Sequence, residues 1–442
     1  YNIIGKKMIL DKKIKDKTAK IGVIGLGYVG LPLAVEFVNA GYDVTGIDVD
    51  EDKIKAINSG KNYIEDIEDE ILSKAVKANK LIATNDFSLV KNLDCLSICV
   101  PTPLNKQKDP DISYIVSVMD RIKKYIHKNM VLILESTTYP GSTKELILPY
   151  IINNRYKIGK DFFLCFSPER IDPGNKIYKT SNTPKVIGGI TKECTKIGVS
   201  LYGSIVDKVI KVSTTETAEM VKLLENTFRA VNIGLANEVA IMCEKLGVNV
   251  WEVIDAAATK PFGYMKFSPG PGLGGHCIPI DPHYLSWKLK TLDYEARFIQ
   301  LASEINTNMP YHVLSLISHY LNIVQKTING SKILLIGVAY KKDINDIRES
   351  PALDVIQLLL NSDAIVDYHD PYVSKIDFNN ISLKNLIKLK KEKLNLYDAC
   401  LIITDHSNIN YELIHDHCQL IIDTRNVFKS KKGSHIKRLG QG

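Results

Sequence analysis

The feature that most constrains the fold of this chain is a glycine-rich turn near its start. Residues 20–30 read K-I-G-V-I-G-L-G-Y-V-G, so an apolar strand leads into Gly25, Gly27 and Gly30, and a helix-compatible segment follows over 31–40. Glycines at this spacing allow a tight turn, let the backbone approach a pyrophosphate, and let the helix pack closely on the strand. The pyrophosphate then lies at the helix N-terminus, where free N–H groups and the dipole favour an anion. The turn therefore predicts a dinucleotide-binding β-α-β unit.

A carboxylate further along the chain indicates which dinucleotide is bound. A second strand ends at Asp48, eighteen residues after Gly30. A carboxylate there accepts hydrogen bonds from the ribose hydroxyls and disfavours a 2′-phosphate, which predicts NAD rather than NADP. The alternative interpretation is a glycine turn that holds no ligand. We expect the turn to contact the cofactor through Gly25, Leu26, Gly27, Tyr28, Val29 and Gly30.

Short apolar runs alternate with helical stretches in the first two hundred residues, which predicts β-α-β units in a parallel sheet. The runs are 20–24, 43–47, 95–100, 131–134 and 162–166. A second series follows Gly330, with runs at 332–338, 364–368, 399–404 and 420–423. Segments 100–103 and 135–141 follow strands of the first series, at the edge where open α/β sheets bind ligands. The alternative for these segments is ordinary turn chemistry.

The middle of the chain predicts a long helix. Residues 213–246 contain no Pro and one Gly, Gly234, and residues 213–216 have the spacing of a capping box before Gly247 supplies a stop signal. Such a helix is about 50 Å long. The predicted fold is therefore α/β, with two Rossmann-like, doubly wound domains (20–208 and 326–442) joined by a central helical domain (209–325). Residues 1–19 form an N-terminal extension in this scheme, with Met8 as the expected start.

Composition narrows the class of protein. The 442 residues are 45% hydrophobic and 24% charged, as in a soluble globular protein, and no apolar run is long enough for a membrane span. The net charge of +7 comes from lysines spread along the chain, without a nucleic-acid-binding module. Eight cysteines without a C-x-x-C pair or a signal peptide predict reduced thiols and a cytoplasmic location. No metal is expected, because the spacing of His415, His417 and Cys418 matches no usual zinc pattern.

Cys277 differs from the other cysteines in its context. It follows the Gly- and Pro-rich stretch 269–275 and precedes Asp281-Pro282, which has the pattern of a helix cap and first helical residue. A thiol just ahead of a helix N-terminus can have a lowered pKa, which makes it a better nucleophile. The alternative is a buried loop cysteine with Asp281 as a cap, and the local sequence leaves both open. Cys95, Cys99, Cys165 and Cys400 lie in apolar runs and are expected to be buried.

Lys222 and Asn226 are four residues apart on the predicted long helix and so share a face. Glu219 and Glu225 lie at ion-pairing spacing from Lys222, as on many solvated helix faces. A solvated face is thus the simpler interpretation of this pair, which does not indicate a site by itself.

Taken together and in this order, these segments resemble the UDP-glucose/GDP-mannose dehydrogenase family from about Lys20 to Phe428. The segments that carry the resemblance are 25–30, 100–103, 136–137, 166–169, 219–226, 274–281, 341–343 and 348–350. The resemblance implies NAD-dependent oxidation of the C6 hydroxymethyl of a nucleotide sugar to a carboxylate, with two NAD per turnover. Cys277 would capture the intermediate aldehyde as a thiohemiacetal, and oxidation of this adduct would give a thioester that water releases.

The resemblance also implies roles for single residues. Lys222 would steady the oxyanion together with Asn226, and Asp281 would help to activate water with Thr137 and Glu169. Besides the turn, the expected NAD contacts are Asp48, Lys53, Thr102, Ser136, Thr137 and Arg348. The expected substrate contacts are Glu169, Arg170, Lys222, Asn226, Tyr264, Gly274, Lys341 and Arg425.

Within the family, segments 167–174 and 260–277 most resemble the UDP-N-acetylglucosamine 6-dehydrogenase branch. UDP-glucose enzymes typically carry an aromatic residue where Arg170 stands and a Lys where Ile280 stands. The resemblance thus implies oxidation of UDP-N-acetylglucosamine for surface-polysaccharide precursors, with UDP-N-acetylgalactosamine, UDP-N-acetylmannosamine and UDP-glucose as alternatives. It also implies a homodimer formed through the long helix.

Two other functions compete with this interpretation. One is a single-step hydroxyacid dehydrogenase of similar build, which uses a Lys and an Asn on the helix and no thiol. The other is a catalytically dead NAD-sensing or scaffold protein. The presence of Cys277, Lys222, Asn226, Thr137 and Asp281 together argues against the second.

Overall fold

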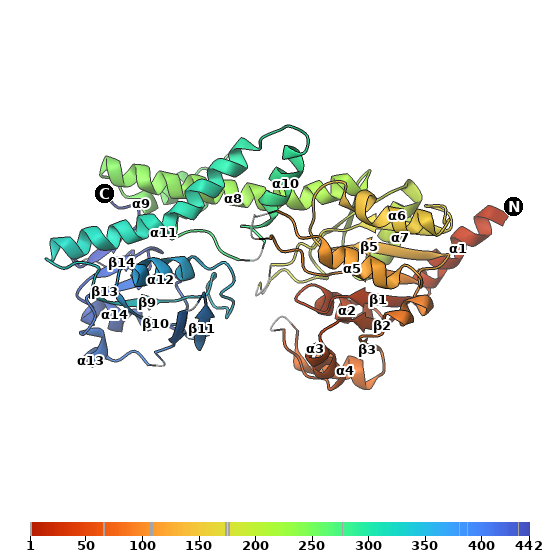
Figure 1. The fold of residues 1–442 in the computed structure, drawn as a ribbon, viewed down its shortest axis with the longest axis horizontal. Helices are drawn as coiled ribbons and strands as arrows, with labels where there is room; N and C mark the ends of the chain where they lie inside the picture. The colour runs from red at the N-terminus through yellow and green to blue at the C-terminus, as the bar shows by residue number, and fades with distance from the viewer. Residues whose placement is uncertain are drawn as a thin grey trace. The chain divides into compact units, whose positions relative to one another are not determined.

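The structure, a computed structural model, describes residues 2–64, 67–105, 109–172, 175, 177–275, 277–379, 381–386, 388–431 and 433–442, with side chains from residue 9 onward. Pro173, Gly174 and His276, which belong to segments of the family resemblance, lie outside the described residues. The chain divides into two compact units. The first runs from the N-terminus to Glu225 and includes His283–Asp293; the second comprises Asn226–Pro282 and Tyr294–Gly442. Each unit contains its own β-sheet (Figure 1).

The first unit is built on an eight-stranded sheet in the order β3-β2-β1-β4-β5-β6-β7-β8. The strands are β1 (Lys20–Ile24), β2 (Asp43–Ile47), β3 (Leu81–Thr84), β4 (Cys95–Ile98), β5 (Met130–Leu134), β6 (Phe162–Phe166), β7 (Lys185–Gly189) and β8 (Val209–Lys211). The predicted parallel sheet is confirmed from β3 to β6, but β7 pairs antiparallel with β6. The sequence did not predict β3, β7 or β8, which are short or include glycine.

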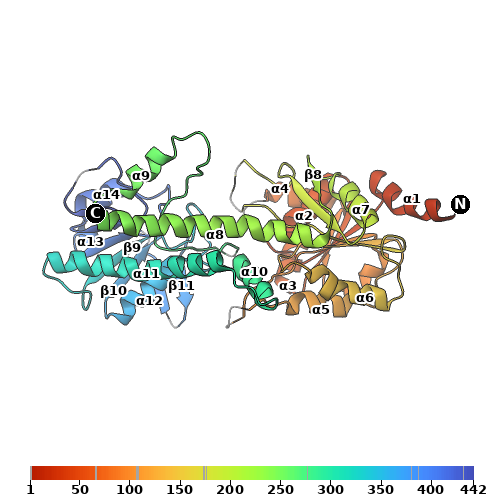
Figure 2. The same ribbon diagram turned by 90° about the horizontal axis from the view of Figure 1, so that it is seen from above.

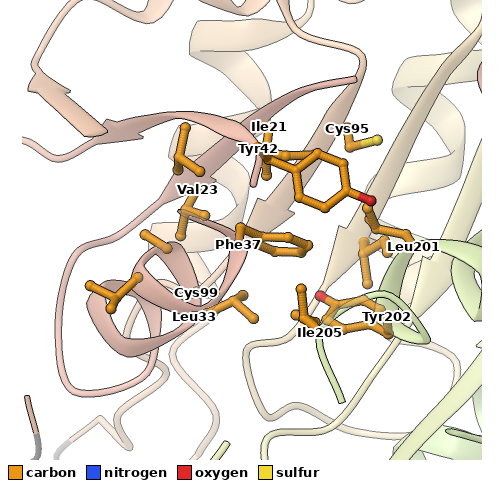
Figure 3. Close-up of a cluster of buried hydrophobic side chains, with 14 of the residues drawn as sticks. Ile21, Val23, Leu33, Phe37, Tyr42, Cys95, Cys99, Leu201, Tyr202 and Ile205 are labelled. Carbon is orange, nitrogen blue, oxygen red and sulfur yellow. The ribbon is translucent and has the colours of Figure 1, made fainter. Parts of the chain in front are cut away.

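Helices connect these strands, as right-handed β-α-β crossovers require. The connecting elements are α2 (Gly30–Asn39), α3 (Glu51–Asn58), α4 (Asp69–Lys77), the 3-10 turn η1 (Phe87–Asn92), α5 (Ser113–Ile122), the π-helical turn η2 (Thr143–Ile147), α6 (Leu148–Asn153) and α7 (Lys192–Tyr202), preceded by α1 (Asn2–Lys15). Figure 3 shows a core cluster that packs between these helices and the sheet, in which the Phe37 ring lies 5.9 Å from Tyr42 and 6.0 Å from Tyr202. The Tyr42 hydroxyl donates to the backbone oxygen of Ile14, so α1 is attached to this core.

The predicted long helix is confirmed as α8 (Thr215–Leu246), seen along its length in Figure 2. Its cap is Thr214 rather than Ser213, because the Thr214 hydroxyl accepts a hydrogen bond from the Thr217 N–H at 3.1 Å. Gly247 ends the helix with a φ of +72°, as its position predicted. Gly234 allows close packing, because a Cβ there would lie 3.2 Å from Ala302 of α11 (Arg297–Ile323).

The second unit contains a five-stranded, all-parallel sheet in the order β10-β9-β13-β14-β15. Its strands are β9 (Lys332–Ile336), β10 (Ile365–His369), β13 (Ala399–Ile402), β14 (Ile421–Asp423) and β15 (Ile436–Arg438), and a separate hairpin comprises β11 (Lys375–Phe378) and β12 (Ile381–Lys384). The remaining helices are α9 (Val250–Ala257), α10 (Asp281–Lys290), α12 (Pro351–Asn361), α13 (Lys391–Leu394) and α14 (Tyr411–His417). The second α/β sheet is confirmed, although β11, β12 and β15 were not predicted. Among the described residues, no helix has both the length and the apolar character that crossing a membrane demands.

Candidate functional site

The glycine turn in the first unit has the geometry that a dinucleotide requires. Gly25 has a φ of +89°, and its N–H donates to the Ile47 oxygen at 2.8 Å. A Cβ at Gly30 would lie 1.7 Å from the Gly25 oxygen, so only glycine lets α2 start this close to the strand. A Cβ at Gly27 would meet nothing within 4 Å. The space at Gly27 is open at the start of α2, where an anion is favoured.

Asp48 holds this turn in place. One of its carboxylate oxygens, Oδ2, accepts from the Leu26 N–H at 2.7 Å, and Oδ1 accepts from the Asp50 N–H at 3.0 Å. Asp50 in turn caps α3 and lies 3.6 Å from the Lys53 ammonium. The Tyr63 hydroxyl donates to the Leu26 oxygen at 2.5 Å, a contact that no sequence pattern indicated. Residues outside the turn therefore hold Leu26 at both its N–H and its carbonyl oxygen.

The carboxyl ends of β4 and β5 meet at the same edge. The Ser136 hydroxyl donates to the Val100 oxygen at 2.8 Å, which joins the two segments that the sequence singled out. A Cβ on Gly25 would lie 2.6 Å from the Cys99 oxygen, so the glycine turn reaches this edge as well. Thr102 is buried there and Thr137 is half-buried. The structure thus brings together the turn, segment 99–102 and segment 136–137.

The solvated-face interpretation of Lys222 is wrong. Lys222 is 8% exposed, and its ammonium donates to the backbone oxygen of Glu169 at 2.7 Å. Glu225 pairs with Arg170 instead, with Nη2 and Oε1 separated by 2.6 Å, and Arg170 Nη1 also donates to the Pro184 oxygen at 2.8 Å. Three predicted site residues, Lys222, Glu169 and Arg170, therefore belong to one hydrogen-bonded group.

Glu219 is buried and anchors the loop after β5 to α8. Its Oε1 accepts from the Thr143 N–H (2.9 Å), the Thr143 hydroxyl (2.6 Å) and the Ser142 hydroxyl (3.0 Å), and its Oε2 accepts from the Gly141 N–H (2.6 Å). Burial raises the pKa of Glu219 even though these donors favour the charged form. The sequence offered Glu219 only as an ion-pair partner of Lys222. Its i, i+3 spacing could have indicated a shared buried face.

Cys277 lies in the second unit and is exposed, whereas the other seven cysteines are buried. The alternative of a buried loop cysteine is therefore wrong, and the predicted burial of Cys95, Cys99, Cys165 and Cys400 is confirmed. The Cys277 backbone oxygen accepts from the N–H groups of Ile280 (3.1 Å) and Asp281 (2.8 Å), so a tight turn leads from the thiol into α10. Asp281 is 4% exposed and its Oδ2 accepts a hydrogen bond from the Asn226 side-chain amide.

The loop before the thiol contacts Arg425, Tyr340 and the backbone of Arg348, all in the second unit. A Cβ on Gly270 would lie 2.5 Å from Arg425 Nη1, and the Gly275 N–H donates to the Arg348 oxygen at 3.3 Å. Gly274 and Gly275 both lie against Tyr340, the neighbour of Lys341. Arg425 also donates from Nε to the Ile403 oxygen at 2.7 Å, and burial lowers the pKa of its guanidinium. Arg348 and Arg425, predicted from separate segments, thus both contact the loop that contains Gly274.

Other predicted residues have less defined surroundings. Tyr28 and Tyr264 are exposed, and Arg348 forms an ion pair with Asp346 at 2.6 Å. In the part of the chain that the structure describes, no group of three or more His, Cys, Asp or Glu residues could hold a metal ion.

Three stretches of the chain match successive domains of one protein family. Residues 19–206 match the NAD binding domain of the UDP-glucose/GDP-mannose dehydrogenase family, residues 216–308 match its central domain, and residues 334–430 match its UDP binding domain. This order of domains, together with the glycine turn, defines an NAD-dependent nucleotide-sugar dehydrogenase. The chain belongs to the UDP-glucose/GDP-mannose dehydrogenase family.

Individual relatives cover nearly the whole chain. A UDP-N-acetyl-D-mannosamine dehydrogenase of Methanococcus vannielii is 35% identical, over 98% of this chain and 100% of the relative. A UDP-N-acetyl-D-glucosamine 6-dehydrogenase of Pseudomonas aeruginosa is 32% identical, over 88% of this chain and 98% of the relative. The solved structure of a UDP-D-ManNAc dehydrogenase from Pyrococcus horikoshii is 34% identical with a TM-score of 0.87, and 96% of this chain and 99% of that one are covered.

Proposed function

We propose that this chain oxidises the C6 hydroxymethyl of a UDP-N-acetylhexosamine to a carboxylate in two successive steps through a covalent adduct on Cys277. The observation that carries the proposal is the exposure of Cys277, alone among eight cysteines, in a turn that ends at the buried Asn226–Asp281 pair. A thiol at a helix N-terminus is favoured as a thiolate, which is the nucleophilic form. A single-step dehydrogenase has no use for such a thiol.

The residues of the chain divide the reaction between them. The first oxidation removes a hydride and a proton from the C6 hydroxymethyl and leaves an aldehyde. The Cys277 thiolate then forms a carbon–sulfur bond with the aldehyde carbon, and a second hydride loss turns this thiohemiacetal into a thioester. Water attacks the thioester, so that the carbon–sulfur bond breaks, the acid leaves and the thiolate returns. This is covalent catalysis, which divides a four-electron oxidation into smaller steps.

Fixed polar groups assist each step in this proposal. Lys222, buried and oriented by the Glu169 oxygen, stabilises negative charge on the sugar oxygen, with Asn226 four residues further along α8. Asp281 accepts a proton from the attacking water, with Thr137 and Glu169 as further polar groups. Arg170 contacts the sugar in this scheme from its place beside Glu225.

The residues of the first unit fit NAD. Gly27 offers open space at the start of α2, and Asp48 is in place to meet the ribose hydroxyls. Lys53, Thr102 and Ser136 are the further proposed contacts in this unit, and Arg348 of the second unit is a proposed contact as well. When bound, NAD supplies the hydride acceptor for each oxidation. The turn, held by Asp48 and Tyr63, would position the dinucleotide without rearranging.

The nucleotide part of the substrate is assigned to the second unit. Arg425 supplies positive charge beside Gly270, and Lys341 follows Tyr340, whose side chain lies against Gly274 and Gly275; we assign both cations to the diphosphate. Tyr264 and Gly274 complete the proposed substrate contacts. For the sugar, UDP-N-acetylmannosamine is favoured by the name of the Methanococcus relative and UDP-N-acetylglucosamine by that of the Pseudomonas relative, while Arg170 argues against UDP-glucose. These two sugars are epimers at C2, so one site could be selective for either.

We also propose a homodimer that forms through α8. Large apolar side chains are exposed along this helix at spacings of four and seven residues, which places them in one stripe: Met220, Leu224, Phe228, Leu235, Met242 and Leu246. A second copy would bury the stripe.

We further propose that the central domain begins at about residue 208 and ends at about residue 325. The proposal also includes a cytoplasmic location and a role in the synthesis of polysaccharide precursors. The eight cysteines, all of them among the described residues, form no disulfide, as a reducing compartment favours.

NADH stoichiometry tests the proposed function. The purified protein is incubated with NAD and, in parallel, limiting UDP-N-acetylmannosamine, UDP-N-acetylglucosamine, UDP-N-acetylgalactosamine, UDP-glucose and GDP-mannose. We expect two NADH per sugar with one of the N-acetylhexosamines, and a thioester mass on the peptide that contains Cys277. Cys277→Ser should stall before acid is released, whereas Cys243→Ser, a buried cysteine on α8, should keep two NADH per sugar.

Two results would contradict this function. One NADH per sugar would indicate a single-step dehydrogenase. Normal acid formation by Cys277→Ser would show that the thiol takes no part.

A further inference from the structure

A buried lysine outside the predicted site lies between two buried carboxylates of the first unit. Lys185 Nζ is 2.5 Å from Glu135 Oε2 and 2.9 Å from Glu169 Oε2. The Lys185 side chain is 4% exposed and that of Glu135 is 0% exposed. A buried charge is costly without partners, so these three groups depend on one another.

The direction of one strand explains how Lys185 reaches this place. Glu135 directly follows β5, and Glu169 follows β6, so both lie at the carboxyl edge of the parallel sheet. A parallel neighbour would begin at the opposite edge, but β7 runs antiparallel to β6 and therefore begins at this one. The pairing joins Phe166 to Gly188, so three residues further along, Glu169 falls opposite Lys185, the first residue of β7.

The surroundings of Glu135 complete the cluster on its inner side. The Tyr202 hydroxyl donates to Glu135 Oε1 and lies 3.1 Å from the Ser97 hydroxyl. The Lys185 ammonium lies 5.1 Å from the centre of the Tyr202 ring. Figure 3 shows Tyr202 among apolar side chains, including Phe37 and Leu201. The cluster is thus closed toward the core, and Glu169 is its member that also belongs to the proposed site.

The pKa values of the two carboxyl groups are shifted in opposite directions. Burial alone would raise the pKa of Glu169, but Lys185 and the N–H groups of Ile171 and Arg170 outweigh burial and hold this pKa below its usual value. Burial raises the pKa of Glu135 even beside Lys185. The same lysine therefore faces one carboxyl group whose pKa is raised and one whose pKa is lowered.

Glu169 links this cluster to the proposed catalytic lysine. Its carboxylate contacts Lys185, while its backbone oxygen accepts the hydrogen bond from Lys222 Nζ at 2.7 Å. Two buried lysines thus contact Glu169, Lys185 at its carboxylate and Lys222 at its backbone oxygen. Because Glu169 Oε1 also accepts from the N–H groups of Arg170 and Ile171, its carboxylate is tied to the backbone that carries this oxygen.

We propose that Lys185 is a positioning residue, which holds the Glu169 carboxylate in place and, through the Glu169 backbone, orients Lys222 for the oxidation. This inference rests on the proposed function, because that function gives Glu169 and Lys222 their roles. Lys185 itself touches neither sugar nor cofactor in this scheme. Its effect on turnover should therefore depend on Glu169.

A double-mutant cycle tests this dependence. The variants Lys185→Met, Glu169→Gln and the combination of both are assayed for kcat with the sugar that the stoichiometry experiment identifies. We expect Lys185→Met to lower kcat by about tenfold or more, while the KM for NAD changes by less than about threefold. In the Glu169→Gln background, Lys185→Met should change kcat by less than about threefold. Lys185→Arg, which keeps the charge, should retain at least about a tenth of the wild-type kcat.

Controls separate positioning from loss of the fold. NAD affinity and the melting temperature are measured for each variant, and Lys13→Met, which removes an ion pair with Asp94 elsewhere in the first unit, should leave kcat unchanged. If Lys185→Met does not fold, the cycle is run in a Glu135→Gln background, where one carboxylate rather than two loses its cation.

Two outcomes would overturn the inference. Lys185→Met with wild-type kcat would show that Glu169 needs no such partner. Losses that multiply in the double variant would show that Lys185 acts independently of Glu169. If the wild-type protein oxidises none of the sugars, the proposed function fails; if it turns over but the cycle is additive, only the role of Lys185 fails.

Discussion

The side-chain amide of Asn226 donates a hydrogen bond to the carboxylate of Asp281, which joins α8 to the first residue of α10. Asp281 lies four residues after Cys277, and the intervening turn is closed by hydrogen bonds to the Cys277 oxygen. Asn226 therefore fixes the position of the carboxylate nearest in sequence to the exposed thiol. Because both partners are buried, the bond is shielded from water and is stronger than an exposed one.

Asn226→Asp should impair release of the acid more than formation of the thioester. The substitution replaces a donor with a second carboxylate beside Asp281, and the like charge disfavours the ionised form that accepts a proton from water. We expect kcat to fall by about 100-fold. Thioester on Cys277 should accumulate, as measured by mass spectrometry of quenched single turnovers. The matched control is Asn232→Asp on the same helix, where the side-chain amide donates to the Phe228 oxygen at 2.7 Å. Near-normal turnover by Asn226→Asp would exclude this role.

Two glycines of the turn should respond differently to the same methyl group. Gly30→Ala places a Cβ 1.7 Å from the Gly25 oxygen, so it should both destabilise the first unit and abolish NAD binding. Gly27→Ala meets no atom within 4 Å, so its melting temperature should stay within about 2 °C of wild type. Its Kd for NAD should nevertheless rise by about tenfold, because the methyl occupies the space that a pyrophosphate approaches. Calorimetric titration and thermal unfolding measure the two effects, and wild-type affinity in Gly27→Ala would place the pyrophosphate elsewhere.

The stability of the second unit should depend on pH through Asp370. Burial would raise the pKa of Asp370, but hydrogen bonds from His406 and the Val338 N–H outweigh it and hold the pKa below the usual 3.8. A folded-state pKa that is depressed contributes stability above the unfolded pKa, and this stability is lost as pH falls through the folded pKa. Asp370→Asn should cost about 2 kcal/mol near neutral pH. With the asparagine oxygen in the place of Oδ2, its amide nitrogen would face the N–H groups of Tyr372 and Val373, which donate to Oδ1 in the wild-type protein. The difference in unfolding free energy between the wild-type protein and Asp370→Asn, measured by urea unfolding, should become smaller below about pH 4.

Asp377 provides a control for this pH effect. Its pKa is also lowered, by Lys375 and Ser382, but it lies exposed on the β11–β12 hairpin. Asp377→Asn should therefore leave both the unfolding free energy and its dependence on pH close to those of the wild-type protein. If the difference in unfolding free energy between wild type and Asp370→Asn stayed constant across the acid range, Asp370 would not titrate as inferred.

A charge on the exposed stripe of α8 should disrupt the proposed dimer. The wild-type protein should have twice the chain mass in light scattering. Leu235→Asp introduces a carboxylate in the middle of the stripe, and burying an unpaired charge at an interface is strongly disfavoured, so this variant should shift toward monomer. Leu396→Asp, on an exposed turn after α13, should remain dimeric. A monomeric wild-type protein would refute the assembly itself.

The local elements of the fold could be predicted from sequence because their signals lie within a few residues. The strands at 20–24, 43–47 and 162–166 occur where the apolar runs placed them, and α8 ends at Leu246 where Gly247 predicts a stop. The antiparallel strand β7 was missed because K-V-I-G-G is short and carries two glycines. Its direction is set by pairing with β6, which no local pattern encodes.

The residues of the candidate site can be separated in the same way, into features that local sequence spacing predicts and contacts that only the folded chain brings together. By itself, the sequence determined the glycine turn with Asp48, the family and the uncommon setting of Cys277, since each depends on spacing along the chain. Only the tertiary structure decided that Lys222 is buried against Glu169, that Asn226 binds Asp281, and that Lys185 joins the two carboxylates. Most of these partners lie about fifty residues apart, and their contacts depend on strand order, strand direction and helix packing. Those are settled by the burial of apolar surface over a whole unit, so a charged residue on a helix or at a strand end reveals its partner only in the folded chain.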